Sequence, residues 1–149
     1  MIERIFNLNT VDALQIAELG QKFYAATGLR GSFHGDTFVV FWNKLLEGGI
    51  ASMWVSREDG RITGTIGMTL TMSLMDGIVL ADEMFWFVDP NHRGSAGLKL
   101  FLEAKKWAKH SGAGRMLMGK MLSIEPEKVG KFYEQQGFKP LQTQYFLDL

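Results

Sequence analysis

The sequence has no cysteine, no excess of charge of either sign and no long apolar run. Without cysteine, a disulfide scaffold, a thiolate nucleophile and a cysteine-based zinc site are all excluded. The 16 Lys+Arg balance the 16 Asp+Glu, which argues against a non-specific nucleic-acid binder, since that needs a cationic surface. The longest uncharged stretch, Ile62–Met75, is too short to span a bilayer, and the N-terminus lacks the apolar core of a signal peptide. We therefore expect a cytoplasmic protein that binds neither nucleic acid nor membrane.

What the sequence does contain is ordinary globular composition over a length that suits one domain, 1–149. Hydrophobic residues make up 46% of the 149 residues and charged residues 21%, which excludes disorder as a description of the whole chain. Phe (11), Met (9) and Trp (4) are plentiful. They indicate either a bulky core or an apolar pocket, and composition does not distinguish the two.

The N-terminal third predicts one short strand and two helices. A strand over 2–7 precedes a helix over 11–27, which Asn9 or Thr10 can cap and Gly28 can end. Asp36 can cap the second helix, which carries an apolar stripe at helical spacing (Phe38, Phe41, Trp42 and Leu45). The stripe is typical of core packing, and part of this helix could also wall an acceptor pocket.

The middle of the chain predicts a three-stranded antiparallel meander over 50–88. A strand over 51–56 leads through an Asp59-Gly60 turn into 65–74, where apolar and polar residues alternate without a break. Asp76-Gly77 is a second two-residue turn signal, and the near-continuous apolar run that follows predicts a strand covered on both faces.

The C-terminal part predicts a helix over 97–110, a strand over 115–122, a short helix from Pro126 to Gly137 and a last strand over 138–147. The element order is β-α-α-β-β-β-α-β-α-β. A crossover helix before residue 115 favours a parallel strand pair there. The fold class is therefore α+β, a mixed and mostly antiparallel sheet flanked by helices.

The turn at 89–98, with the sequence DPNHRGSAGL, is a candidate phosphate site. Small residues let backbone amides approach a ligand, and a helix N-terminus and Arg93 add positive charge. A tight turn whose glycines serve only backbone geometry explains the pattern equally well. Neither the Walker loop nor the G-x-G-x-x-G spacing of dinucleotide folds is present. A nucleotide phosphate site of some other class remains a third, weaker interpretation.

Two motifs and the element order resemble the GNAT superfamily of N-acetyltransferases. The segment VDPNHRG before a helix is similar to the family's V-x-P-x-x-R-G-x-G-x-G/A turn, and KFYEQQGF, which spans 131–138, is similar to its L-Y-E-K-x-G-F signature. The resemblance implies that acetyl-CoA binds here, with its pyrophosphate on the amides of the turn. The residues it assigns to the coenzyme are Phe87, Val88, Arg93, Gly94, Ser95, Ala96, Gly97 and Leu98.

The turn departs from the family pattern in one place. When Arg93 is aligned with the family arginine, Ala96 and Leu98 stand where the family has small residues. When the helix is aligned instead, Gly97 matches and the loop is one residue shorter. Both alignments keep Arg93-Gly94.

Glu83 is the candidate general base for an acceptor amine. If Asp76-Gly77 forms a two-residue loop, Leu70 faces Glu83 and the carboxylate shares an apolar face with Met68, Met72, Phe85 and Phe87. Loss of hydration there raises its pKa toward a useful range, and it acts directly or through a water. A solvated or ion-paired glutamate is the alternative, and Asp82, on the opposite face, is the reserve candidate.

Tyr133 is the candidate acid, because a neutral phenol can donate to the departing CoA sulfur. The resemblance places the family's tyrosine at this position, and a packing aromatic beside Phe132 is the alternative. The three histidines share no metal-ligand spacing, so we expect no metal site.

We therefore expect an N-acetyltransferase that moves an acetyl group from acetyl-CoA to a primary amine, on a small molecule or a peptide, by direct attack. The alternative is a non-catalytic acyl-CoA-binding or structural module of the same fold. A homodimer built on 138–147 is a further hypothesis, taken from family habit.

Overall fold

The computed structural model describes residues 1–149 and divides into two compact units, Met1–Gly119 and Lys120–Leu149. The first unit carries the sheet and three helices, and the second carries one helix and the C-terminal segment. The single-domain expectation stays a prediction. None of the four helices combines the length and the hydropathy that crossing a bilayer requires.

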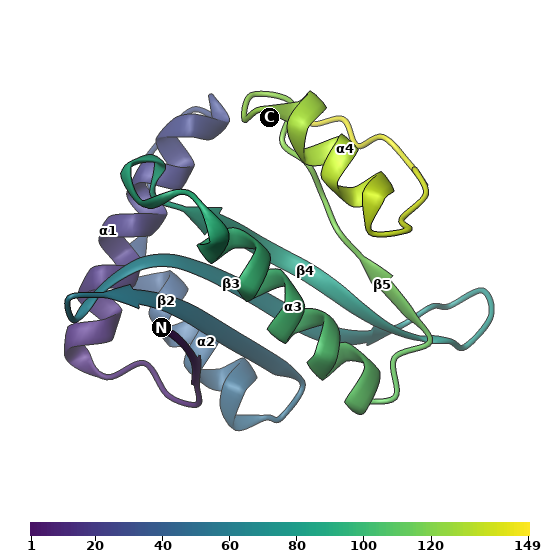
Figure 1. Cartoon of the computed structure of the whole chain (residues 1–149), viewed down its shortest axis with the longest axis horizontal. Coiled ribbons are helices and arrows are strands. Elements are labelled where there is room, and N and C mark those ends of the chain that lie inside the picture. The colour runs from purple at the N-terminus through teal and green to yellow at the C-terminus, as the bar shows by residue number, and fades with distance from the viewer. The chain divides into compact units, whose positions relative to one another are not determined.

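The first unit is built on one five-stranded sheet in the order β1-β2-β3-β4-β5 (Figure 1). Its strands are antiparallel except for the last pair, in which β5 runs parallel to β4. The crossover helix before residue 115 predicts this parallel pair. The strands are β1 (Ile2–Ile5), β2 (Ala51–Glu58), β3 (Arg61–Met72), β4 (Val79–Val88) and β5 (Arg115–Leu117).

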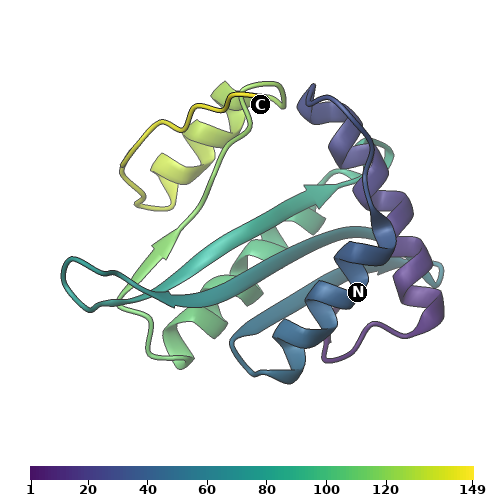
Figure 2. The same cartoon turned by 180° about the vertical axis from the view of Figure 1, so that it is seen from behind.

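Helices cover both faces of this sheet and create two separate cores. Helix α3 (Ser95–His110) lies on the face seen in Figure 1, and α1 (Thr10–Thr27) and α2 (Gly35–Glu47) lie on the face seen from behind in Figure 2. Side chains of β2 alternate between the cores, as a pleated strand requires: Met53 and Val55 pack with α1 and α2, and Trp54 packs with α3.

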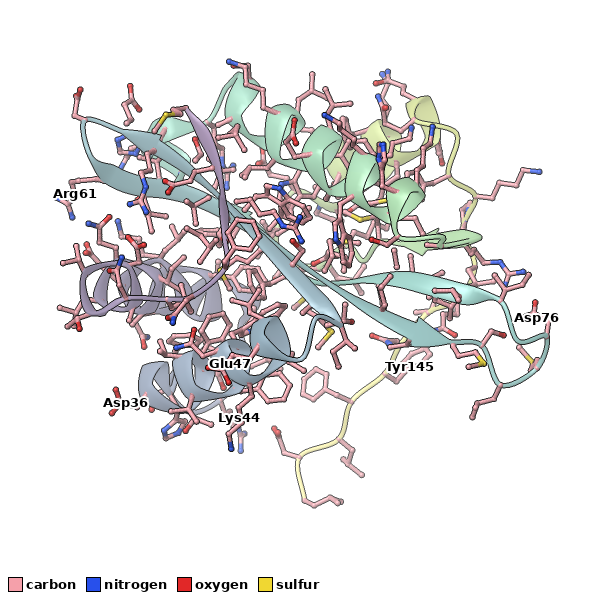
Figure 3. All side chains as sticks on the ribbon, turned by 90° about the horizontal axis from the view of Figure 1, so that it is seen from below. Asp36, Lys44, Glu47, Arg61, Asp76 and Tyr145 are labelled. Atoms are coloured by element: carbon pink, nitrogen blue, oxygen red, sulfur yellow. The ribbon has the colours of Figure 1, made fainter.

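Local signals explain where the first two helices begin and end. Asn9 caps α1 by accepting the Asp12 N–H at 2.9 Å, and Gly28 at φ 74° ends it, as predicted. The predicted Asp36 cap is wrong, because α2 begins at Gly35 and Asp36 lies in its first turn, where a negative charge suits the helix dipole. Figure 3 shows Asp36 and Lys44 on the side of α2 away from the sheet.

The two hairpins of the meander differ in their turns. Asp59-Gly60 forms the predicted two-residue turn, with positive φ at both residues. The second turn is longer than predicted, because the Ser73 N–H donates to the Ile78 carbonyl and closes a four-residue loop over 74–77. Figure 3 places the two hairpin tips at opposite ends of the sheet, at Arg61 and Asp76.

This longer loop changes the register of β3 and β4. Leu70 pairs with Ala81 rather than with Glu83, and Met68 is the residue opposite Glu83. A bulge follows at once, because Gly67 pairs with Phe85 and Met84 is the extra residue. The expected common face of Glu83 and Phe85 is therefore wrong: the bulge sends Phe85 to the α1/α2 core.

The last two predicted strands are shorter or absent. Strand β5 covers 115–117 instead of 115–122, and 138–147 forms no strand, so the sheet has five strands and not six. Pro140 has no N–H to donate, and the three-residue β5 offers only a short edge for pairing. In the second unit, α4 (Pro126–Gln135) begins with proline, as predicted, and Gly137 follows its end at φ 87°.

Candidate active site

Strands β4 and β5 part in the middle of β4, and this parting is the centre of the site. Their last pair is Asp82 with Leu117, whereas β4 continues to Val88. Figure 1 shows the two strands diverging from a shared start. The outer edge of β4 is therefore not paired with β5 over its last six residues, and a ligand with amide groups could pair there.

Two hydrogen bonds show how β4 presents its backbone on either side of the bulge. The Ile78 carbonyl accepts from Ser73 at 2.9 Å, and the Asp89 N–H donates to Thr63 at 2.8 Å, both on the β3 side. Backbone groups alternate between the two sides of a strand. Even-numbered residues thus face β3 before the bulge, and odd-numbered residues face it afterwards.

It follows that Glu83, before the bulge, directs its backbone groups away from β3, toward the parting. Beyond the bulge, Trp86 and Val88 do the same, whereas Phe87 faces β3. Of the two strand residues that the family resemblance assigned to the coenzyme, only Val88 has its backbone on the outer edge. Phe87 contributes a buried ring instead, at 7% exposure. Trp86 was missed because its orientation depends on a bulge that the sequence does not signal.

Glu83 stands where the strands part. Its Oε2 accepts the backbone N–H of Gly119 at 2.9 Å, so the carboxylate reaches from β4 to the chain just after β5. Removal from water raises the pKa of Glu83 to about 7; the Gly119 hydrogen bond opposes this rise and the charge of Asp82 adds to it. A carboxyl with a pKa near neutrality can both accept and release a proton at physiological pH.

Asp82, the reserve candidate, lies opposite Thr69 and belongs to the other side of the strand. Loss of hydration raises its pKa as well. Its two neighbours in the ladder, Leu117 and Thr69, enclose it between paired strands, whereas Glu83 lies just beyond the last β4–β5 pair. Glu83 is therefore the better placed of the two for a ligand in the parting.

The turn after β4 is held in place by Asp89. Its side chain accepts the Asn91 N–H at 3.0 Å and caps a short 3-10 helix, η1 (Pro90–His92). It also binds the ammonium of Lys22 on α1 at 2.6 Å. These contacts lower the pKa of Asp89, the Lys22 hydrogen bond most of all. The chain direction into the following turn is thereby fixed.

Helix α3 starts directly after this turn, at Ser95, two residues earlier than predicted. Gly94 precedes it at φ 148° and ψ −130°, a conformation that is essentially restricted to glycine. No side chain caps the helix, so the amides of Ser95, Ala96 and Gly97 point out of its first turn. Arg93 and Gly94 are exposed beside them.

This first turn fits a diphosphate. A Cβ at Gly97 would lie 3.5 Å from the Trp86 ring, an ordinary contact, so packing does not require glycine there. Its absence leaves room for a ligand to approach the amides. Leu98, also assigned to the coenzyme by the resemblance, is an exposed residue of the same turn.

An aromatic pocket of about 180 Å³ lies on the other face of β4. We call it the aromatic pocket; its lining residues are Ile16, Leu19, Gly20, Phe23, Tyr24, Phe33, Phe38, Thr65, Met84, Phe85 and Phe87. Composition left open whether the many aromatic residues fill a core or line a pocket, and they do both.

A second, larger cavity of about 390 Å³ lies at the β2–β3 hairpin end; we call it the polar cleft. Most of its charged groups are paired: Lys22 with Asp89, Arg61 with Glu18 at 3.3 Å, and His92 4.0 Å from Glu58. No group of three or more His, Asp or Glu side chains is arranged to hold a metal ion.

Tyr133 belongs to the second unit. Its side chain is 8% exposed in α4, and its ring lies 6.0 Å from that of Phe132 and 5.6 Å from that of Phe138. Within this unit it is a packing residue, and its role as an acid stays a prediction.

Comparison with known proteins identifies the family. The profile described as "Acetyltransferase (GNAT) family" matches residues 16–138, which is most of the chain. The chain belongs to the GNAT acetyltransferase family. No curated protein matches the sequence.

Solved structures of acetyltransferases confirm the α+β fold. A Trypanosoma brucei acetyltransferase is 20% identical, covers 100% of both chains and gives a TM-score of 0.74. A ribosomal-protein-alanine N-acetyltransferase from Brucella melitensis (20% identity, 100% and 99% coverage) gives 0.70. A glucosamine-6-phosphate N-acetyltransferase from Arabidopsis thaliana (18% identity, 99% of each chain) gives 0.75. At these identities the likeness concerns the fold, and the acceptors named for these proteins differ from one another.

Proposed function

We propose that this GNAT protein is an acetyl-CoA-dependent N-acetyltransferase that acetylates a primary amine by direct attack. The observation that carries the proposal is Glu83, a carboxyl with a pKa raised to about 7, placed where β4 parts from β5. A base of this strength is suited to removing a proton from an ammonium group near neutral pH.

In the proposed complex, the outer edge of β4 pairs with the pantetheine amides through Trp86 and Val88. The first turn of α3 holds the diphosphate through the amides of Ser95, Ala96 and Gly97, with the guanidinium of Arg93 beside them. The partial positive charge of the helix N-terminus favours this placement. This route runs from Glu83 along β4 into α3 without a break in the chain.

Acetyl-CoA supplies the acetyl thioester, whose C–S bond breaks as the new N–C bond forms. Glu83 takes one proton from the acceptor ammonium and passes it to solvent, which leaves a neutral nucleophile. The Met84 N–H, at the bulge beside Glu83, donates to the carbonyl oxygen as negative charge develops there. Tyr133 gives its phenolic proton to the leaving sulfur, and the second amine proton restores it. The products are an amide, CoA thiol and one released proton.

A calorimetric titration with acetyl-CoA, CoA and ATP tests the binding half of the proposal. We expect a dissociation constant near or below about 100 μM, or roughly −5.5 kcal/mol, for both CoA forms and none for ATP. An amine screen that detects released thiol tests the chemistry. ATP binding without CoA binding would instead indicate a different phosphate site.

The second candidate function is a non-catalytic acyl-CoA-binding module, which the departure at Ala96 and Leu98 motivates. Such a module would bind acetyl-CoA and release no thiol with any amine in the screen.

A further inference from the structure

The lining of the aromatic pocket is almost entirely apolar. None of its lining side chains is charged, and six of them are aromatic: Phe23, Tyr24, Phe33, Phe38, Phe85 and Phe87. The Thr65 hydroxyl donates to the Trp54 carbonyl at 3.0 Å and is thus already used. Unmatched polar groups of a ligand would lose their hydration here without finding partners.

Ring contacts set the shape of the pocket. Phe38 lies 5.2 Å from Phe85 and 5.4 Å from Phe33, and Phe23 lies 5.2 Å from Phe87 (centroid distances). These contacts join α1, the loop before α2, α2 itself and β4. These contacts within the protein form the pocket without a ligand, so the pocket is preformed.

Gly20 brings one wall close to α1. A Cβ on Gly20 would lie 2.4 Å from the Phe33 ring, so only glycine lets this ring rest against the helix. The resulting volume of about 180 Å³ resembles that of cavities, about 150 Å³, that hold a benzene molecule. A phenyl group matches it in size and chemistry.

The pocket is linked to the candidate base by the bulge. Met84 lines the pocket and directly follows Glu83, whose side chain lies opposite Met68 on the α3 side of the sheet, whereas Asp82, opposite Thr69, lies on the same side as the pocket residues Thr65 and Phe85. No cationic side chain lines the pocket. One carboxyl on the pocket's side of β4 and a second at the parting, next to it in the strand, match a ligand with one ammonium group and an apolar body.

We propose that the aromatic pocket holds the body of the acceptor, so that the substrates are apolar, phenyl-sized primary amines such as arylalkylamines. This inference rests on the proposed acetyltransferase function. Polyamines, aminoglycosides and sugar phosphates would have to bury charges or hydroxyls that the pocket cannot pair.

The first test compares acceptors at a fixed concentration of acetyl-CoA. We expect kcat/KM for phenethylamine to exceed that for ethylamine by roughly 10- to 150-fold, as burial of one aromatic side chain implies. Spermidine and glucosamine 6-phosphate should be weaker than phenethylamine. Equal values for ethylamine or spermidine would overturn the inference.

Variants of the pocket provide the second test. Gly20→Ala pushes the Phe33 ring into the cavity, so kcat/KM should fall at least tenfold for phenethylamine and stay the same for ethylamine. Alanine is favoured over glycine in a helix, which protects the fold of this variant. Phe33→Ala enlarges the cavity and should shift the preference toward a naphthyl amine. Phe41→Ala, an exposed aromatic residue of α2 outside the lining, is the control.

A binding measurement separates the two proposals. Saturation-transfer NMR with phenethylamine alone should detect the ring protons bound to the full chain, and Gly20→Ala should abolish the signal. If acetyl-CoA does not bind while this signal behaves as expected, the acetyltransferase proposal fails and the pocket assignment stands. If acetyl-CoA binds and spermidine is acetylated but phenethylamine neither binds nor reacts, the acetyltransferase proposal stands and the pocket assignment fails.

Discussion

The polar cleft and the aromatic pocket differ in more than size. The polar cleft is about twice as large, at roughly 390 Å³ against 180 Å³, yet most of its charged groups are paired with one another. The aromatic pocket has no charged side chain in its lining, and its lining residue Met84 follows the candidate base Glu83 in the chain. The comparison teaches that volume alone does not mark a binding site, because a cavity whose polar groups are already paired gains little from a ligand.

The two cavities also have different relations to stability. Ion pairs that hold the polar cleft are partly exposed, with Arg61 and Glu18 at 70% and 55% side-chain exposure. Such pairs contribute little. The rings of the aromatic pocket belong to the core between α1, α2 and the sheet. Changes at the pocket should therefore affect both function and stability, whereas loss of an exposed ion pair at the cleft should change either property little.

The largest effect is expected from Glu83→Gln, which removes the base but keeps the shape. Turnover should fall about 10²- to 10⁴-fold while calorimetry shows unchanged acetyl-CoA binding. The wild-type rate should rise with pH through an apparent pKa of about 7, because only the deprotonated carboxylate accepts a proton. Asp82→Asn is the matched control, and an unchanged pH profile in Glu83→Gln would exclude Glu83 as the base.

The next largest effect is expected from Phe85→Ala, which removes a side chain that lines the aromatic pocket. Phe85 lies 4.8 Å from Trp42 and 5.2 Å from Phe38, so truncation leaves a cavity in the core. The free energy of unfolding should drop by about 3–5 kcal/mol in a urea titration. Arg61→Ala, at the rim of the polar cleft, should change it by less than about 0.5 kcal/mol. Equal losses for both variants would contradict the contrast drawn between the cavities.

A glycine pair tests the turn that follows Asn91 and His92 of the polar cleft. Gly94→Ala should cost about 1–3 kcal/mol of stability, because alanine is strained at φ 148°. Gly97→Ala has an ordinary helical position with room for a Cβ, so its stability should be unchanged or higher. Acetyl-CoA affinity should fall in both variants. Unchanged affinity in Gly97→Ala would remove Gly97 from the proposed diphosphate site.

A smaller effect is expected at the polar cleft, from Asp89→Asn. The folded protein lowers the pKa of Asp89, so its carboxylate stabilises the fold above the unfolded pKa, and this contribution is lost as the pH falls below about 4. The variant should be about 1 kcal/mol less stable than the wild type at pH 7 and equally stable at pH 2. Thermal unfolding across this pH range measures the difference, and a gap that persists at pH 2 would point to lost packing instead of lost charge.

Most of the fold could be predicted because its signals are local. Asn9, Gly28 and Asp59-Gly60 act through hydrogen bonds and φ angles of their own neighbourhood, and each performs as expected. The strand predicted over 138–147 failed because a strand also needs a partner, which its own sequence does not describe. The second hairpin failed for a related reason: a four-residue loop and a two-residue turn share the same Asp-Gly signal.

The parts of the site that depend on residue type and order in the sequence could be predicted. Glu83 and the turn from Arg93 to Gly97 carry enough in their residue types and order to be singled out. The aromatic pocket was not predictable as a pocket, since Phe23, Phe33 and Phe87 lie far apart in sequence and carry no signal besides their abundance. Nor was the role of Met84, because a bulge depends on how two strands pair.

The bulge has a consequence for how this protein tolerates sequence change. Met84 is half exposed, at 49%, and many side chains should be accepted in its place. Its removal should be tolerated by the fold as well, because Glu83 and Phe85 already lie on opposite faces, and regular alternation from Ala81 would keep Phe85 and Phe87 on the α1/α2 side and Trp86 and Val88 on the α3 side. A survey of single-residue deletions along β4 should therefore find the smallest loss of stability at Met84, because a deletion elsewhere in the strand moves the residues between it and the bulge to the opposite face.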